Sequence, residues 1–239
     1  ASFKSTLSLK FKKNDATGYS YFINAIERAD GKNSEAHNVT IDNCTFESNN
    51  WHYAIAAKNP QNLVVSNCTA TNVYYFIYIP QGGDGLTVTN CNVPKATYGI
   101  GAQKCKNVYV KDYTYTGKAA GFYGRAVSHK ITAVLENVNI TTTLSGQAAI
   151  SIWKTDTEGA IQLYTIEIRG TFQVATPEGT AWFTCNDANQ NYAICLTDKN
   201  ITLEGQENWK VTTNVEGYEV VYNDGVYSLA EIKADVAQI

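Results

Sequence analysis

Short stretches of alternating apolar and polar residues recur along the chain at intervals of about 22 to 25 residues. The segment 37–46 (HNVTIDNCTF) is followed by similar segments at 61–70 and 84–93, and by looser copies at 106–115 and 131–140. Alternation with a period of two predicts β-strands that bury every second side chain. We therefore expect equivalent strands to lie above one another.

A second alternating stretch lies between these repeats, at 53–57, 75–79 and 98–102. Each period thus contains a strand, a polar turn, a second strand, an asparagine corner and a third short strand, with no helix that could join parallel strands. Parallel strands without crossover helices form a solenoid. The sequence therefore predicts an all-β fold, a single-stranded parallel β-helix of about seven coils at 21–213, preceded by an N-terminal cap at 1–20.

An asparagine marks one corner of each repeat. Asn43, Asn67 and Asn90 fall at this corner, and Asp112 and Asn137 take the equivalent places. Asn and Asp tolerate left-handed backbone dihedrals and bond their own backbone, which suits a tight corner. We expect the stacked side chains to form a buried asparagine ladder.

The six cysteines include no Cys-x-x-Cys pair, which argues against a thiolate zinc site; no metal or cofactor is predicted. Three of them follow the corner asparagines in the phase of the apolar positions, so we expect them to be stacked, buried and reduced: Cys44, Cys68 and Cys91. The pattern leaves the redox state of the other three open: Cys105, Cys185 and Cys195.

With these motifs the sequence resembles the right-handed parallel β-helix superfamily, which includes pectate lyases, polygalacturonases and phage tailspikes. The resemblance covers about residues 21–203 and implies a right-handed solenoid. It is specific for the fold and nearly silent about activity. It adds handedness to the predicted fold, a right-handed parallel β-helix.

The C-terminal segment carries a second resemblance. Residues 216–229 (EGYEVVYNDGVYSL) look like the closing hairpin of β-helical modules in large surface proteins of gut bacteria, where a segment like 234–239 opens the next module. This likeness implies a β-hairpin cap and the start of a linker at 214–239, in a monomer or one module of a larger chain. Together with the lack of any Met, it favours a bacterial protein that is secreted or exposed on the cell surface.

Charge and hydropathy argue against two classes of partner, nucleic acids and membranes. The formal net charge is -3, and the 19 Lys and Arg residues are scattered singly, so nucleic acid is not an expected partner. Apolar runs fall well short of the roughly 20 residues that span a bilayer, so membrane insertion is not expected.

Three ionisable residues are candidates for catalysis. Lys111 and Glu136 take outward positions one coil apart, where they would act as base and partner in a polysaccharide lyase or form an exposed ion pair. His129 lies at a turn, as a catalytic or a surface residue. The motifs of polygalacturonases and pectate lyases are missing. A lyase or glycoside hydrolase, with its site among longer loops near 154–159 and 186–191, is the alternative function.

Aromatic residues give the stronger signal. Phe76 and Tyr78 are expected to face outward because their phase is opposite to that of Ile77, and Trp153 extends the same side. Such rings stack on sugars, or are covered by a loop or a neighbouring module. The sequence favours a noncatalytic, adhesin-like surface module that contacts a glycan or another surface protein.

Overall fold

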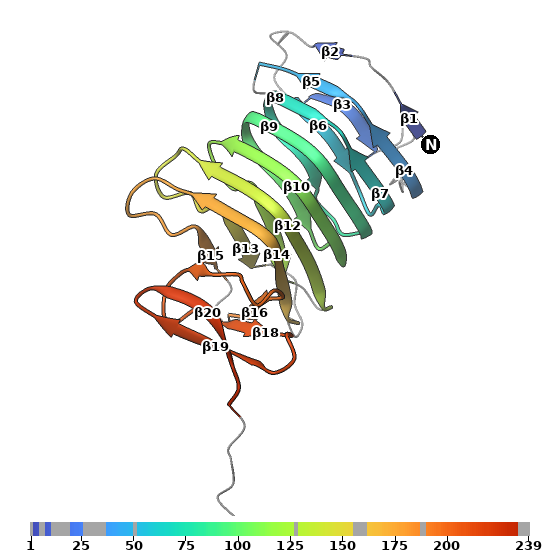
Figure 1. Cartoon of the computed structure of the whole chain (residues 1–239). Coiled ribbons are helices and arrows are strands. Elements are labelled where there is room, and N and C mark those ends of the chain that lie inside the picture. Colours follow the sequence, from blue (N-terminus) through green and yellow to red (C-terminus); the bar gives the residue numbers. More distant parts are fainter. Residues whose placement is uncertain are drawn as a thin grey trace, which may run out of the picture.

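The computed structural model describes residues 2–4, 8–10, 20–25, 37–49, 52–126, 129–154, 162–186 and 190–233. All regular structure in these ranges is β, so they contain no helix that could cross a membrane. Most of the strands belong to one parallel sheet, which winds into a solenoid of about six turns, close to the predicted number (Figure 1).

Three faces of the solenoid are built from strands that pair with their counterparts in the next coil. The first face contains β1 (Ser2–Lys4), β4 (His37–Asp42), β7 (Gln61–Ser66), the first parts of β9 (Asp84–Gln103), β10 (Asn107–Gly117), β12 (Ile131–Thr142) and β14 (Tyr164–Ala175), and then β16 (Tyr192–Leu196) and β18 (Val211–Thr213). The second face contains β2 (Ser8–Lys10), β5 (Thr45–Glu47), the start of β8 (Thr69–Ile79) and the continuations of β9, β10, β12 and β14. The third face contains β3 (Ser20–Ala25), β6 (His52–Ala57), the ends of β8 and β9, β11 (Phe122–Ala126), β13 (Ile150–Lys154) and β15 (Phe183–Cys185).

Equivalent side chains stack in register inside the solenoid. The clearest column runs along the first face through Ile41, Val65, Val88, Val110, Leu135 and Ile168. Each of these side chains is at most 1 % exposed. The register confirms the repeats read from the sequence, since every copy places its branched apolar residue directly above the previous one.

A separate antiparallel sheet packs on the C-terminal end of the solenoid (Figure 1). Its strands lie in the order β17 (Leu203–Glu204), β20 (Val226–Glu231) and β19 (Tyr218–Asn223). Strands β19 and β20 form the predicted hairpin, with Asp224 and Gly225 at positive φ in its two-residue turn. Leu203 and Tyr227 are buried in the main core, so the sheet closes that end.

The described part of the predicted N-terminal cap supplies strands β1 and β2. They pair in parallel with β4 and β5, as the strands of a coil would. Residues 1, 5–7 and 11–19 lie outside the described residues, as do 155–161, 187–189 and 234–239, which include much of the predicted long loops and the linker. The domain boundaries at 20 and 213 stay a prediction.

The asparagine corner forms as predicted in its backbone but lies on the exposed outside of the solenoid. All five predicted corner residues have φ between 50° and 54°. The side-chain amide of Asn67 donates to Asp42 Oδ1 at 2.7 Å, that of Asn90 to Asn67 Oδ1 at 2.7 Å, and that of Asn137 to Asp112 Oδ1 at 3.0 Å. The expectation of a buried ladder was wrong, because the side chain of each left-handed corner residue is exposed and that of the next residue is buried.

We expect Asn67→Leu to destabilise the protein by about 1 to 2 kcal/mol, because a side chain other than Asn, Asp or Gly is strained in the left-handed conformation. Asn67→Gly removes the same amide bonds without that strain, and should cost less. Urea unfolding midpoints of the two variants test this. Equal midpoints would show that the ladder bonds, and not the backbone conformation, set the need for Asn.

The corner cysteines stack inside the solenoid, as predicted. Cys44, Cys68 and Cys91 are 6 %, 1 % and 2 % exposed, and all six cysteines of the chain are free. The hydrogen bond to Cys68 and burial raise the pKa of Cys91, and burial raises the pKa of Cys105 to about 12. The thiols of Cys91 and Cys105 therefore stay protonated at neutral pH and behave as small apolar groups.

Tyrosines fill the solenoid where the opposite strand carries glycine. Tyr164 is fully buried, and its hydroxyl has no hydrogen-bond partner among the described residues. A Cβ atom on Gly124 would lie 2.3 Å from that hydroxyl, so only glycine leaves room for it. Tyr115 is equally buried, but its hydroxyl hydrogen is shared between the carbonyls of Thr97 and Ala119, which both lie 2.9 Å from the hydroxyl oxygen.

The two tyrosines should therefore respond oppositely to removal of the hydroxyl. Tyr164→Phe removes an unsatisfied buried polar group and should leave stability unchanged or raise it by about 1 kcal/mol. Tyr115→Phe removes the donor that the Ala119 carbonyl shares with Thr97, while Thr97 keeps the backbone N–H of Ala119, and should cost about 1 to 3 kcal/mol. Thermal and urea melts compare the two variants; a larger loss for Tyr164→Phe would contradict the assignment.

Candidate functional site

The outward side of the third face differs from the prediction at one residue. Phe76 was expected to point outward, but its side chain is 0 % exposed and its ring stacks in the core, 6.4 Å from the ring of Tyr113. Phe76 and Ile77 both belong to the core, whereas Tyr75 and Tyr78 lie outside it. Two consecutive residues therefore point inward, although the strand keeps its register with β9 from Tyr75 to Ile79. Phe76 is therefore not a contact residue.

Tyr78 and Trp153 do lie outside the core, within a set of packed rings that we call the aromatic cluster. Its members are Tyr21, Tyr53, Tyr74, Tyr75, Tyr78, Tyr98, Tyr123 and Trp153. Strand register places Tyr53, Tyr75 and Tyr98 above one another. Their ring centroids are 5.1 Å and 4.6 Å apart with interplanar angles of 3° and 10°, so they form a stacked column. Repetition of Tyr in the second alternating stretch was the signal for this column.

Polar contacts fix the other end of the aromatic cluster. The Tyr123 ring stacks on Trp153 with centroids 4.5 Å apart. The Tyr123 hydroxyl donates to the Tyr75 hydroxyl at 3.1 Å and accepts from Gln103 Nε2 at 2.8 Å. Gly101 makes this possible, because a Cβ atom there would lie 2.7 Å from the Tyr123 ring. Burial raises the pKa of both tyrosines, so their hydroxyls remain protonated.

Part of the aromatic cluster remains accessible. Tyr75 and Tyr123 are 6 % and 0 % exposed, but Tyr78, Tyr98 and Trp153 are only partly buried. The buried rings hold the accessible ones in place, with few rotamers left to lose on binding. Rigid aromatic side chains with polar tips are suited to contact a sugar or a protein surface at low entropic cost.

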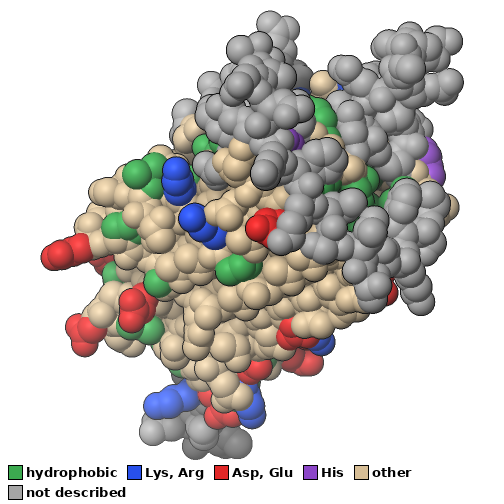
Figure 2. All heavy atoms as spheres, turned by 90° about the horizontal axis from the view of Figure 1, so that it is seen from above, with side chains coloured by type: hydrophobic (Ala, Val, Ile, Leu, Met, Phe, Trp, Pro, Cys, Tyr) green, Lys and Arg blue, Asp and Glu red, His purple; other side chains and the backbone are tan. Residues whose placement is uncertain are grey.

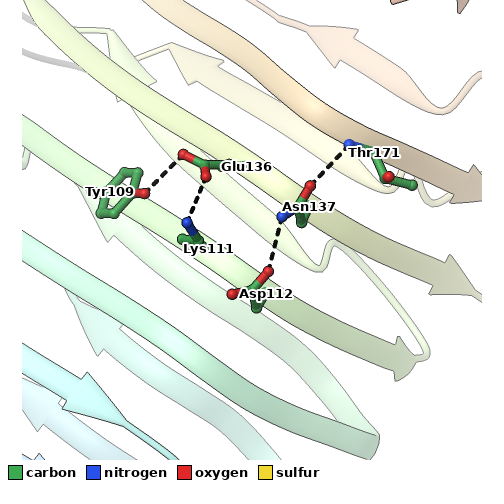
Figure 3. Close-up of polar contacts among 6 residues, drawn as sticks. All are labelled: Tyr109, Lys111, Asp112, Glu136, Asn137 and Thr171. Atoms are coloured by element: carbon green, nitrogen blue, oxygen red, sulfur yellow. Dashed lines mark hydrogen bonds and ion pairs between the residues drawn. The ribbon is translucent and has the colours of Figure 1, made fainter.

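The ionisable candidates of the first face form an ionic cluster around Glu136 (Figure 3). Lys111 Nζ lies 2.7 Å from Glu136 Oε1, and the Tyr109 hydroxyl donates to Glu136 Oε2 at 2.8 Å. The predicted pairing of Lys111 with Glu136 across one coil is confirmed. The side chains are 37 % and 22 % exposed, so this is a surface ion pair.

These contacts favour the charged forms of both partners. The hydrogen bonds from Lys111 and Tyr109 lower the pKa of Glu136, and Glu136 raises the pKa of Lys111. A lysine that acts as a general base needs a pKa lowered toward neutrality. The electrostatics of this cluster therefore suit an ion pair better than the base of a lyase.

His129 is not brought to the ionic cluster. Its Nε2 lies 3.3 Å from the carbonyl oxygen of Lys104, at the turn before β12. Glu136 is five residues beyond Ile131, the first residue of β12, which is about 16 Å along the strand. The sequence candidates for catalysis thus do not converge on one point.

A shallow hollow of about 570 Å³ beside the ionic cluster contains residues that the sequence did not single out. Its lining includes Glu136, Arg169, Asp198 and Lys199. Arg169 Nη2 is paired with Glu167 Oε2 at 2.7 Å. Asp198 and Lys199 belong to a turn after β16, where the repeats are degenerate and give no register. Within the described ranges, no three His, Cys, Asp or Glu side chains gather as a metal site would require.

Comparison with known families decides the handedness of the coil. The family described as "Right handed beta helix region" matches residues 5–166, which is more than half of the chain. The chain belongs to this right-handed β-helix family. No curated protein and no solved structure matches the chain.

The right-handed β-helix therefore presents two separate candidate surfaces. The aromatic cluster lies on the third face and the ionic cluster on the first. Charged side chains of both signs are spread over the side seen in Figure 2 and do not gather into one patch. The aromatic cluster is the more extended of the two, since its rings come from six strands, whereas the ionic cluster involves β10 and β12.

The ionic cluster predicts a specific acid dependence. Because the pKa of Glu136 is lower in the folded protein, its carboxylate stabilises the fold above the unfolded pKa of about 4.3. This contribution is lost as the pH falls through the lower folded value. The stability difference between the parent and Glu136→Gln should therefore be largest at neutral pH and shrink below about pH 4. Urea melts across this range measure it.

Glu178→Gln is the matched control, because Glu178 is exposed in a turn after β14. Like most surface substitutions, it should change the free energy of unfolding by less than about 0.5 kcal/mol at neutral pH. A parent-to-Glu136→Gln difference that stays constant from pH 7 to acid would contradict the role given to Lys111 and Tyr109.

Proposed function

We propose that this right-handed β-helix is a noncatalytic, adhesin-like module of a secreted or cell-surface bacterial protein, and that it binds a glycan on the aromatic cluster. The supporting observation is the stacked column of rings that leaves Tyr78, Tyr98 and Trp153 partly exposed. Sugar rings present apolar C–H faces that pack on aromatic rings, while hydroxyl groups remain free to bond the tyrosine tips.

The geometry of the aromatic cluster supports a preorganised binding surface. Tyr78 packs against Tyr53 and Tyr75 with ring centroids 5.1 Å and 4.8 Å apart, and Trp153 is fixed by Tyr123. Little side-chain freedom remains to be lost when a ligand lies across the coils. Preorganisation of this kind raises affinity without requiring new contacts. Another surface protein is the alternative partner for the same surface.

An enzymatic alternative rests on the hollow next to the ionic cluster. Glu136, Arg169, Asp198 and Lys199 line one depression, so carboxylates and cations share a surface that a sugar chain could reach. A lyase or hydrolase needs one of these groups to titrate near neutral pH. The pKa of Glu136 is lowered and that of Lys111 is raised, so both move away from neutral pH. This favours the binding function over catalysis.

A glycan array, followed by assays for reducing ends and unsaturated products on every glycan bound, separates the two functions. Binding without product supports the proposed module. Product formation that is lost in Glu136→Gln, with no dependence on Trp153, would instead assign the function to the hollow.

Substitutions at Tyr78 and Phe76 should have different effects, because Tyr78 belongs to the aromatic cluster and Phe76 to the core. Tyr78→Ser should lower the affinity for a glycan found on the array by about 2- to 10-fold, because one stacking contact is worth about 0.5 to 1.5 kcal/mol. Phe76→Ser should instead destabilise the fold by about 3 to 5 kcal/mol, since it empties a core site. Titration calorimetry and urea melts measure the two effects.

Tyr218→Ser is the control, because Tyr218 is a partly exposed tyrosine of the C-terminal hairpin, outside the aromatic cluster. It should leave glycan affinity unchanged. Unchanged affinity in Tyr78→Ser as well would remove the aromatic cluster from the binding surface.

A further inference from the structure

One strand of the C-terminal antiparallel sheet has a free edge. In the order β17, β20 and β19, the two outer strands are both edges, but β17 has two residues and β19 has six. Among the described strands, β20 alone pairs with β19. An unpaired edge presents a row of backbone N–H and C=O groups to which an extended chain can bond.

The register of the hairpin shows which backbone groups lie on this edge. Antiparallel ladders alternate between hydrogen-bonded and non-hydrogen-bonded pairs. Just before β19, the Ile232 N–H donates to the Gly217 carbonyl at 2.9 Å, so these two residues form a bonded pair. The bonds to β20 therefore fall on the odd-numbered residues of β19, and the N–H and C=O groups of Val220 and Tyr222 point away from β20.

Strand β19 lacks the features that usually block an edge. Natural edge strands often carry proline, lysine or a β-bulge that prevents further pairing. The β19 sequence (YEVVYN) contains neither proline nor lysine, and its register with β20 has no shift from Tyr218 to Asn223. Its β-branched and aromatic residues favour the extended conformation, and the Tyr222 hydroxyl donates to the Gly205 carbonyl at 3.3 Å. The edge is therefore preformed for the addition of a strand.

The charge around β19 selects among possible strands. Glu216 precedes β19, Glu219 lies within it, Asp224 follows it and Glu231 ends β20, and all four residues are exposed. Lys233 is the one cation of the described hairpin, and no described cation forms an ion pair with these carboxylates. Two copies of this acidic edge repel one another, whereas a strand with cationic side chains gains cross-strand ion pairs.

We propose that the free edge of β19 binds an extended, lysine- or arginine-rich segment of another protein, which adds a fourth strand to the C-terminal sheet. The backbone groups of Val220 and Tyr222 supply the pairing, and Glu219 with its neighbouring carboxylates supplies the preference for positive charge. No residue of this edge belongs to the aromatic cluster, so the inference does not depend on glycan binding.

The experiment uses the whole chain and peptides that separate strand pairing from charge. The main probe is a short peptide in which lysine alternates with valine. One control peptide carries proline in place of valine, so it keeps the charge but cannot join a ladder. The other carries glutamate in place of lysine. Titration calorimetry should show binding of the lysine–valine peptide, and binding of each control that is weaker by about tenfold or more.

Amide hydrogen exchange, measured by NMR, locates the bound peptide. In the protein alone the Val220 and Tyr222 amides should exchange fast, because no described strand pairs with them. The lysine–valine peptide at about ten times its Kd should slow the exchange of both amides by about tenfold. The Val221 amide, which already bonds to β20, should change less.

A charge reversal in the middle of the edge tests the preference for basic strands. Glu219→Lys should weaken binding of the lysine–valine peptide by about 2- to 10-fold and strengthen binding of its glutamate counterpart. Glu47→Lys makes the same charge change on β5, near the other end of the solenoid, and should alter neither affinity. Urea melts confirm that both variants are folded.

Several results would overturn the inference. Slow exchange of the Val220 amide in the protein alone would show that the edge is already covered. Equal affinity for the lysine–valine and lysine–proline peptides would reduce the interaction to charge attraction without a strand. Equal affinity for the lysine and glutamate peptides, or an unchanged preference in Glu219→Lys, would remove the charge selection. A dimer in sedimentation velocity whose formation slows exchange at Val220 would make a second copy the occupant. Each of these results leaves the proposed glycan binding untouched, because that function is tested on the array.

Discussion

In-register parallel pairing between successive coils is the constraint on which the rest of the molecule depends. Each backbone strand bonds the equivalent strand of the next coil, and neighbouring strands lie about 4.8 Å apart. A side chain therefore meets its own counterpart one period later. This one geometry has four consequences: the aliphatic columns, the cysteine stack, the corner asparagines and the tyrosine column. Each of them needs a residue type that packs well against another copy of itself.

The repeats made most of the fold predictable because parallel pairing converts sequence similarity directly into spatial contact. The column that begins at Ile41 and the pairing of Lys111 with Glu136 follow from period and phase, whereas the C-terminal hairpin was predicted from its likeness to the closing hairpins of other β-helical modules. Two local features were less predictable. At Phe76 the alternation is interrupted within a strand, and at Asn67 the left-handed backbone turns the amide outward. A period of two assumes strict alternation along an extended strand, so it fails at both places.

The candidate site could be predicted only in part. Tyr78 and Trp153 were identified from phase, but Tyr123 and Gln103 were not, because neither recurs in the adjoining coils. Their significance depends on what lies near them in three dimensions: Tyr123 stacks on Trp153 of the next coil and accepts a hydrogen bond from Gln103. Sequence repeats predict the scaffold. The neighbours of a residue that occurs in only one coil are known only from the three-dimensional structure.

The antiparallel sheet at the C-terminal end has a consequence for association. An open solenoid exposes unpaired backbone groups on its last coil, which would invite another copy to add its own strands and extend into a fibre. Strands β17, β19 and β20 form a separate antiparallel sheet, and Leu203 and Tyr227 pack it against the core. This terminal sheet covers the C-terminal end of the core, which disfavours the addition of another copy at that end.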